Sequence, residues 1–394
     1  MKPLERTRSL VAGLTGYTAA PAGADCFFMS RALDLAWQGA GRTEPNPLVG
    51  AVVVRDGVVV GEGYHRRCGE SHAETIALDV AGTLAAGATL YASLEPCAHH
   101  GRTPPCTDRI IESGVRRVVI PALDPDERVF GMGIARLRGH GIHVESGCLE
   151  EAAIATNLGY YMRQLGIESS VTLKMAVTLD GRIASAPGRR DNVTGEASIH
   201  YAHQLRANHD AVLIGVGTAI ADSPSLDCRL HPSERSPVPV VLDSRLRLPV
   251  ENRWTAEGRP FIVITGPGAD AARRSALERN GGRVLECGSS EDGSVDVGEA
   301  VRLLAGEGMR RILVEGGARV FSSFLSAGKW DAILAFVSPK LYGETGVPMY
   351  ARREPVEPEM VAVDALRFGD DFLHRYLNRR TYAEIERRLA RTDA

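Results

Sequence analysis

Two short segments of the chain combine thiols, imidazoles and a carboxylate at spacings that suit metal chemistry. The first, "SHAET", holds His72 and Glu74, and the second, "SLEPCAHHGRTPPC", holds Cys97 and Cys106. One imidazole and two thiolates fill three corners of a tetrahedral zinc site and leave the fourth to water, whose pKa the metal lowers toward about 7. A structural site would use a fourth protein ligand. The sequence therefore indicates a catalytic zinc site at His72, Cys97 and Cys106, with Glu74 left as an acid and base.

The order of these residues is typical of zinc deaminases. In that class His-x-Glu is followed by Pro-Cys and a second Cys, and the glutamate carries protons to the departing amine. Deaminases of nucleic acids close the motif as Cys-x-x-Cys, whereas the segment "AHHGRTPP" separates Cys97 from Cys106 here. A buried structural zinc site or unrelated free thiols would be the alternative interpretation. Four residues of the right type in the right order favour a deaminase.

The elements around these residues predict an α/β layer. An Asp56-Gly57 turn between two apolar runs predicts a hairpin, and the later alternation of strands and helices predicts parallel strands. His72 is expected in the first turn of its helix and Cys106 just before the next one, where helix N-termini stabilise thiolates. The expected helices span 26–41, 72–82, 107–114 and 150–166, and the expected strands span 48–54, 58–64, 88–96 and 115–124.

A second α/β pattern begins at Val171, so we place a domain boundary just before it. The chain of 394 residues is long for one core, because about 150 residues per domain is usual. The expected limits are a flexible arm at 1–24, a deaminase domain at 25–168 and a second domain at 169–394. In the second domain, strands are expected at 171–184, 210–217, 238–244, 260–265 and 310–317, and helices at 197–209, 271–281 and 297–308.

Several longer segments make the chain resemble one family. "TEPNPLVGAVVV", "GEGYH", "HAE" and "LEPCAHHGRTPPC" resemble the deaminase domain of the bifunctional riboflavin-biosynthesis deaminase/reductases, and "LKMAVTLDGRIA", "GVGTAIADSPSLDCR" and "ILVEGGARVF" resemble their reductase domain. The resemblance implies a cytidine-deaminase-like α/β/α domain followed by a dihydrofolate-reductase-like α/β domain. It implies deamination of 2,5-diamino-6-hydroxy-4-(5-phosphoribosylamino)pyrimidine with zinc, then reduction of the ribosyl group to ribityl with NADPH.

In the deaminase domain the resemblance implies the zinc and acid/base roles already given, and it adds Asn46 as a substrate residue. By itself Asn46, which lies between two prolines, would be read as a turn residue. His65, His99 and His100 are further candidates for substrate contact. The alternative for each of them is a polar loop histidine with no chemical role.

In the reductase domain the resemblance implies two sets of residues. The substrate residues are Arg206, Leu226, Arg229 and Glu315, and the cofactor residues are Ala176, Thr218, Asp222, Ser244, Gly317, Ala318, Arg319, Val320, Phe321, Ser322 and Ser323. A guanidinium fork suits phosphate oxygens, and glycines before a helix allow a phosphate to approach its N-terminus. By themselves Gly316-Gly317 would be an ordinary tight turn and Arg206 a solvated surface charge.

Three departures from the family pattern fall in the second domain. Thr178 replaces a serine and keeps its hydroxyl, Asn192-Val193-Thr194 stands where Trp-Ile-Thr is usual, and Ser223 replaces an aspartate. Without the tryptophan ring the cofactor loses stacking area. The alternative function is therefore a zinc deaminase with a catalytically impaired second domain.

The amino-acid composition limits the classes of partner that the chain can be expected to bind. With 46 basic and 49 acidic residues the net charge is -3, so we expect a small-molecule substrate and no nucleic acid. Seven scattered cysteines suit a reducing cytoplasm. No apolar stretch approaches the roughly 18 residues of a membrane span, and the run 10–14 is short for a signal peptide. We expect a homo-oligomer, either a dimer or a tetramer, and no membrane association.

Overall fold

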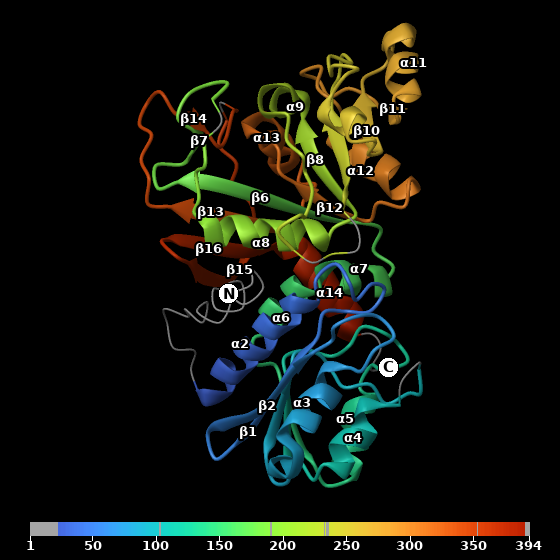
Figure 1. Cartoon of the computed structure of the whole chain (residues 1–394), viewed down its shortest axis with the longest axis vertical. Helices are drawn as coiled ribbons and strands as arrows, with labels where there is room; N and C mark the ends of the chain where they lie inside the picture. The colour runs from blue at the N-terminus through green and yellow to red at the C-terminus, as the bar shows by residue number, and fades with distance from the viewer. Residues whose placement is uncertain are drawn as a thin grey trace. The chain divides into compact units, whose positions relative to one another are not determined.

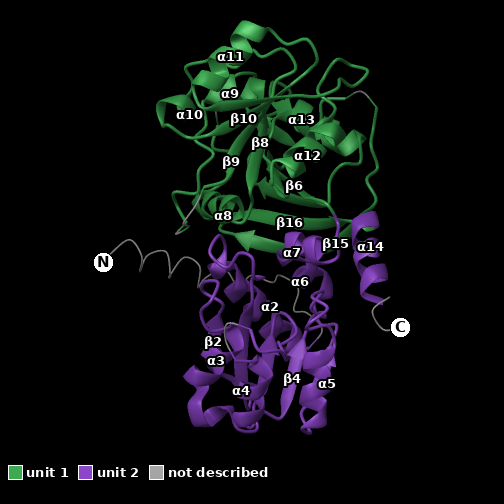
Figure 2. Cartoon of the chain, turned by 90° about the vertical axis from the view of Figure 1, so that its right-hand side faces the viewer, with its two compact units in different colours: residues 1–16, 168–379 green, residues 17–167, 380–394 purple. Residues whose placement is uncertain are grey.

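The computed structural model describes residues 23–101, 104–189, 191–231, 233, 236–352 and 354–390. The predicted flexible arm, apart from its last two residues, lies outside the described residues. The chain divides into two compact units (Figure 2). Of the described residues, unit 2 contains 23–167 and 380–390, and unit 1 contains 168–379. The C-terminal helix therefore groups with the N-terminal part of the chain, although the predicted domain limits placed it with the second domain.

Unit 2 is built on a five-stranded mixed sheet with the order β2-β1-β3-β4-β5. The β2-β1-β3 pairings are antiparallel and the β3-β4-β5 pairings are parallel, as the predicted hairpin and strand–helix alternation require. Its elements are α2 (Ala24–Ala36), η1 (Trp37–Gly39), β1 (Gly50–Arg55), β2 (Val58–Tyr64), α3 (Ala73–Ala81), η2 (Gly82–Ala85), β3 (Thr89–Ala92), α4 (Cys106–Glu112), β4 (Arg117–Ile120), α5 (Met132–Gly139), β5 (His143–Ser146), α6 (Glu150–Thr156), α7 (Leu158–Gln164) and α14 (Arg379–Ala390).

Helices α2 and α3 cover opposite faces of this sheet (Figure 1). Successive side chains of a strand point to opposite faces. Ala51 and Val53 of β1 share a core cluster with α3, whereas a Cβ on Gly50 would lie 2.0 Å from the carbonyl oxygen of Ala32 in α2. Only glycine at position 50 lets α2 approach this closely. The result is the predicted α/β/α arrangement.

Unit 1 is built on a nine-stranded sheet with the order β11-β10-β9-β8-β12-β6-β13-β16-β15, and a small β14-β7 ribbon (Figure 1). In this order, every neighbouring pair from β11 to β13 is parallel, and the β13-β16 and β16-β15 pairs are antiparallel. Its elements are β6 (Ser170–Thr178), β7 (Arg182–Ala184), α8 (Glu196–Ala207), β8 (Ala211–Gly215), α9 (Val216–Asp222), β9 (Val238–Leu242), α10 (Arg253–Ala256), β10 (Phe261–Thr265), α11 (Ala271–Arg279), β11 (Gly282–Glu286), α12 (Val297–Gly306), β12 (Arg311–Val314), α13 (Ala318–Ser326), β13 (Ala332–Ser338), β14 (Val347–Pro348), β15 (Met360–Phe368) and β16 (Asp371–Asn378).

Most predicted elements are present, and the differences have local causes. The predicted helix 150–166 is broken at Asn157, whose side chain instead bonds both the backbone N–H and the carbonyl of Leu48, at 2.8 and 2.9 Å. The predicted strand 171–184 turns at Gly181, which has a φ of 73°. The short elements α5, β5, α9, α10 and β11 were not predicted, because their runs are too brief for a clear period. No helix among the described residues is long and apolar enough to cross a membrane.

Candidate functional site

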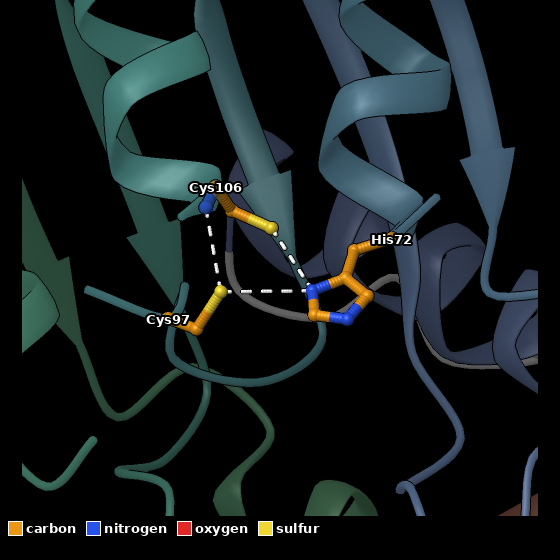
Figure 3. A group of neighbouring side chains, drawn as sticks. All are labelled: His72, Cys97 and Cys106. Atoms are coloured by element: carbon orange, nitrogen blue, oxygen red, sulfur yellow. Dashed lines mark hydrogen bonds between the residues drawn. The ribbon is translucent and has the colours of Figure 1, made fainter. Parts of the chain in front are cut away.

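His72, Cys97 and Cys106 form a compact group in unit 2 (Figure 3). One ligand atom from each lies within 4.8 Å of the other two. His72 Nδ1 is 3.2 Å from Cys106 Sγ and 3.6 Å from Cys97 Sγ. Residues from two segments of the chain, up to 34 positions apart, thus present one nitrogen and two sulfur atoms to a common point. This donor set is the one that zinc prefers.

Two helix starts and one strand end position these ligands. His72 is the N-cap residue of α3, and Cys106 is the first residue of α4 rather than a residue before it. Cys97 follows the end of β3, and its carbonyl accepts bonds from the N–H and the hydroxyl of Thr107, both at 3.2 Å. The backbone N–H of Cys106 lies 3.3 Å from Cys97 Sγ. The peptide dipoles at the start of α4 therefore favour a thiolate on Cys97.

The contact between the two thiols shifts their pKa values in opposite directions. The hydrogen bond from Cys106 lowers the pKa of Cys97 to about 4 against the opposing effect of burial, and His72 adds to the lowering. The same hydrogen bond and burial raise the pKa of Cys106. Contact with Cys97 raises the pKa of His72. A cation at this point would displace the remaining protons, because zinc binds thiolates and neutral imidazole.

Glu74 lies in the first turn of α3, beside His72, and is 3% exposed. Its Oε2 atom is buried without a hydrogen-bond partner among the described residues. Burial raises the pKa of this carboxyl group above its ordinary value. An unpaired buried carboxylate oxygen is costly unless a ligand or water pairs with it. The residues present therefore fit a zinc site with a water molecule beside Glu74.

A pocket opens onto this group and contains several predicted residues. Asn46 lines the pocket, and its Nδ2 lies 3.1 Å from Nε2 of His65. His65 is buried, and this burial lowers the pKa of its imidazole. The His65 ring packs edge-on against His72, with centroids 5.1 Å apart. His99 also lines the pocket, whereas His100 is not among its described lining residues.

Sequence reasoning missed one wall of the pocket. Asp124, Asp126, Arg128 and Val129 follow β4 and line the pocket together with Tyr160 of α7. Burial raises the pKa of Asp124 to about 7, and its Oδ1 accepts a hydrogen bond of 2.8 Å from the Tyr160 hydroxyl. The signal available was position alone, because these polar residues directly follow a parallel strand.

In unit 1 a buried charge cluster lies at the carboxyl end of β12. Glu315 receives two hydrogen bonds from Arg206, at 2.7 and 2.8 Å, and Lys174 Nζ lies 4.0 Å away. Burial alone raises the pKa of Glu315, but Arg206 and Lys174 outweigh it and hold the value at about 2. The fold thus brings Arg206 and Glu315 together. Arg206 is buried on α8, which rules out the alternative of a solvated surface charge.

Arg229 and Leu226 lie beside this cluster. Arg206 Nη1 bonds the Asp227 carbonyl at 3.2 Å, and Arg229 Nη1 bonds the Asp227 carboxylate at 2.6 Å. Leu226 has a φ of 50°, a left-handed conformation that turns the chain just before Asp227. The predicted substrate residues of unit 1 therefore form one group around Asp227.

The predicted cofactor residues gather at the carboxyl ends of neighbouring parallel strands. Helix α13, which holds the residues from Ala318 to Ser323, starts directly after Gly317 at the end of β12. A Cβ on Gly317 would lie 3.4 Å from Thr218 Oγ1 of α9, and one on Gly316 would lie 2.5 Å from Val320. Asp222 ends α9 and Ala176 belongs to the adjacent β6, while the Ser244 carbonyl abuts Gly266. Such a glycine-lined helix start fits a cofactor phosphate.

Comparison with known proteins finds a family model for each of the two units. A family model described as the cytidine and deoxycytidylate deaminase zinc-binding region matches residues 23–122, and one described as the RibD C-terminal domain matches residues 169–374. The riboflavin biosynthesis protein RibD of Aquifex aeolicus (strain VF5) is 42% identical over 318 residues, 80% of this chain and 87% of that protein. The chain belongs to the RibD family.

Other RibD proteins extend this match. RibD of Escherichia coli (strain K12) is 37% identical over 81% of this chain and 89% of its own. The structure of Acinetobacter baumannii RibD, form 1, is 33% identical with a TM-score of 0.63, covering 90% of this chain and 98% of that one. A Thermotoga maritima structure, titled a diaminohydroxyphosphoribosylaminopyrimidine deaminase/5-amino-6-(5-phosphoribosylamino)uracil reductase, is 37% identical with a TM-score of 0.64, covering 90% and 99%.

RibD membership confirms the predicted fold classes and the predicted pairing of a zinc-binding deaminase region with a reductase domain that uses NADPH. The match to the reductase domain covers the segment with the departures at Asn192 and Ser223. The comparisons give no support to the alternative of an impaired second domain.

Proposed function

We propose that unit 2 deaminates 2,5-diamino-6-hydroxy-4-(5-phosphoribosylamino)pyrimidine and that unit 1 reduces the ribosyl group of the product to ribityl with NADPH. The observation that carries the first assignment is the buried, unpaired Oε2 of Glu74 beside the His72, Cys97 and Cys106 group. The second rests on the buried Glu315 cluster next to the glycine-lined start of α13. RibD-family membership supports both.

In unit 2, His72, Cys97 and Cys106 would hold the zinc ion, which when bound supplies Lewis-acid activation of water. Glu74 accepts a proton from that water and delivers it to the amino group that leaves as ammonia, while a new C–O bond replaces the C–N bond. The raised pKa of Glu74 suits a group that must both accept and give a proton near neutral pH. Asn46, held by His65, orients the pyrimidine edge.

In unit 1, the start of α13 with Gly317 and Thr218 would bind the cofactor phosphates, and NADPH supplies the hydride. Arg229 is the better placed arginine for the substrate phosphate, because its side chain is 57% exposed and Arg206 is committed to Glu315. Lys174 and Glu315, 4.0 Å apart, would fix the orientation of the substrate. Hydride transfer needs reacting atoms held about 3 to 3.5 Å apart.

The finer partner and compartment assignments belong to this proposal. The seven cysteines are scattered along the chain without the density of a disulfide framework, which supports a reducing compartment such as the cytoplasm. The slightly acidic net charge supports a small-molecule substrate rather than nucleic acid. We further propose that the chain works as a homo-oligomer, a dimer or a tetramer, which sedimentation of the purified protein tests.

The decisive experiment is incubation of the purified chain with the diamino pyrimidine substrate, with and without NADPH, followed by mass analysis. Without NADPH we expect the deaminated product alone, about one mass unit heavier, because oxygen and a hydrogen replace an amino group. With NADPH we expect a further gain of two hydrogens. Loss of the first shift would refute the deaminase assignment, and loss of the second alone would refute the reductase assignment.

A further inference from the structure

The side chain of Glu95 connects the strand end that carries Cys97 to the opposite wall of the pocket. Glu95 is 3% exposed, and each of its oxygens accepts two backbone hydrogen bonds. Oε2 accepts from the N–H groups of Asp124 and Gly131, at 3.3 and 3.0 Å. Oε1 accepts from those of Gly133 and Ile134, at 3.0 and 3.3 Å. One buried carboxylate thus binds four amides of a single segment, 124–134.

This contact is shaped for close approach. Gly131 is the N-cap residue of α5 with a φ of 68°, so the helix start turns its amides toward the carboxylate. A Cβ on Gly133 would lie 2.1 Å from the Pro96 carbonyl oxygen and 3.1 Å from Glu95 Oε1. Only glycine at position 133 allows the helix start to lie this close to residues 95 and 96. Helix N-termini also favour negative charge, which stabilises the contact.

The segment that Glu95 holds carries the polar wall of the pocket. Asp124, Asp126 and Arg128 line the pocket. They are ordered relative to one another, since Asp124 Oδ1 accepts from the Asp126 N–H at 2.9 Å and Asp126 Oδ1 accepts from Arg128 Nε at 2.9 Å. Residues 124, 131, 133 and 134 tie this ordered stretch to Glu95, and the Tyr160 hydroxyl holds Asp124 from α7. The carboxylate is therefore the link between the wall and the strand end that carries Cys97.

We infer that Glu95 is a positioning residue for the deamination substrate. Glu95 itself lines the pocket, but both of its oxygens accept backbone N–H groups, so it acts through the backbone of 124–134. This inference rests on the proposed deaminase function of unit 2. Because the wall faces substrate while His72, Cys97 and Cys106 hold the metal, loss of Glu95 weakens substrate binding far more than it slows the chemical step.

Glu95→Gln tests this role at nearly constant volume. One Gln oxygen still accepts two amides, but the new NH₂ group meets the other two N–H donors and pushes them away. We expect the deaminase KM to rise at least about tenfold, kcat to stay within about threefold, and zinc content to remain near one per chain. Amide hydrogen exchange at 124–134 should accelerate with no substrate present. Glu62→Gln, whose carboxylate pairs with Arg31 away from the pocket, is the matched control with unchanged KM.

Gly133→Ala tests the same contact from the other side. Its Cβ must displace α5 from Pro96 while Glu95 keeps its charge, so the same rise in KM is expected. Gly139→Ala is the control, since its Cβ meets nothing within 4 Å at the end of the same helix. An unchanged KM and unchanged exchange in both Glu95→Gln and Gly133→Ala would overturn the inference. A wild-type chain that fails to deaminate would instead overturn the proposed function, and the exchange measurement separates the two outcomes.

A separate observation concerns two thiols outside the zinc group. Cys26 in the first turn of α2 and Cys148 after β5 lie with their sulfur atoms 2.7 Å apart, although 122 positions separate them in the chain. Both side chains are half-buried. Burial and the contact with Cys26 raise the pKa of Cys148 to about 12, so Cys148 is the thiol that keeps its proton.

From this geometry we infer that Cys26 and Cys148 form a dithiol site that reacts with small-molecule disulfides. The Cys26 thiolate attacks one sulfur of a disulfide R–S–S–R, forms a mixed disulfide and releases one RS⁻. Cys148 then loses its proton and attacks the Cys26 sulfur, which forms the Cys26–Cys148 bond and releases the second RS⁻. The two protein thiols are oxidised and the small disulfide is reduced to two thiols. The new bond ties α2 to the far end of the same unit.

Glutathione disulfide is the probe for this site. After treatment of the zinc-loaded chain, mapping of unreduced peptides should find Cys26 joined to Cys148, and the thermal midpoint of unit 2 should rise by several degrees, because the bond closes a long loop. Cys148→Ser should instead retain glutathione on Cys26, and the control Cys287→Ser should behave as the wild type. Glutathione retained on Cys26 in the wild type, no reaction at all, or a Cys97–Cys106 bond formed in its place would each overturn the inference.

Discussion

Arg206 and Glu315 form a bidentate ion pair inside unit 1, with Nε to Oε1 at 2.7 Å and Nη2 to Oε2 at 2.8 Å. Both side chains are largely buried, and Lys174 lies 4.0 Å from the same carboxylate. Since the third nitrogen of Arg206 bonds the Asp227 carbonyl, this guanidinium has no fork left for a phosphate. The pair fixes Glu315 and leaves Arg229 as the accessible cation of the group.

This ion pair predicts acid-sensitive stability in unit 1. The pKa of Glu315 is lowered from 4.5 to about 2, so its stabilisation is complete above the unfolded value and is lost as pH falls toward 2. Glu315→Gln should therefore lower the free energy of unfolding by about 3 kcal/mol at pH 7 and by clearly less at pH 3.

Urea unfolding followed by tryptophan fluorescence measures this difference, because Trp254 and Trp330 are buried in unit 1. Glu286→Gln, which removes a half-exposed carboxylate paired with Arg274, serves as control and should cost under about 1 kcal/mol. An equal loss from Glu315→Gln at both pH values would show that the charge of Glu315 contributes nothing.

Zinc content depends on Cys97. We expect about one zinc ion per wild-type chain, and Cys97→Ser should lose most of it, because a serine hydroxyl is a poor zinc ligand at neutral pH. Metal analysis by mass spectrometry after dialysis measures both. Cys228→Ser removes a buried thiol of unit 1 and should retain the metal. Full zinc and full deamination in Cys97→Ser would remove this residue from the site.

Glu74→Gln separates metal binding from proton transfer. The amide preserves the shape of the side chain but carries no proton between water and the amine, so kcat for deamination should fall by about 10³-fold. Zinc content and the thermal midpoint should stay close to wild type, since burial of the charged form is unfavourable. Steady-state assay of ammonia release gives kcat. Near-normal turnover would transfer the acid/base role to another group, with His99 the next to test.

Arg229→Ala should weaken substrate binding in the reductase reaction. A charged contact to phosphate is worth about 1.5 to 3 kcal/mol, so KM should rise roughly 10- to 100-fold with kcat within about threefold. NADPH oxidation followed by absorbance measures both constants. Arg253→Ala, an exposed arginine paired with Glu257 on α10, is the control. A rise in the KM for NADPH instead would place Arg229 at the cofactor.

The candidate zinc site was predictable because the types of its residues and their order in the sequence indicate its chemistry. His72, Glu74, Cys97 and Cys106 lie in two short segments, and their types and order match the zinc deaminase signature. The two α/β patterns were also predictable from the sequence, since apolar strands alternate with helices over long stretches. Asn46 and the reductase residues came from family resemblance, and spacing alone would not have found them.

The order of residues in the sequence could not predict which partner each polar side chain contacts. Glu95 stands next to the predicted ligands, yet its four amide donors come from 124–134, a segment without a clear period. Cys26 and Cys148 are unremarkable in sequence and adjacent only because α2 packs against the sheet that ends at β5. The sequence by itself determined the metal, the reaction class and the two α/β patterns, because these follow from side-chain chemistry and local periodicity, and its resemblance to a family added the two specific folds. The tertiary structure decided that Arg206 binds Glu315 and that Asp124 lines the pocket, because chain segments far apart in sequence meet only when the core packs.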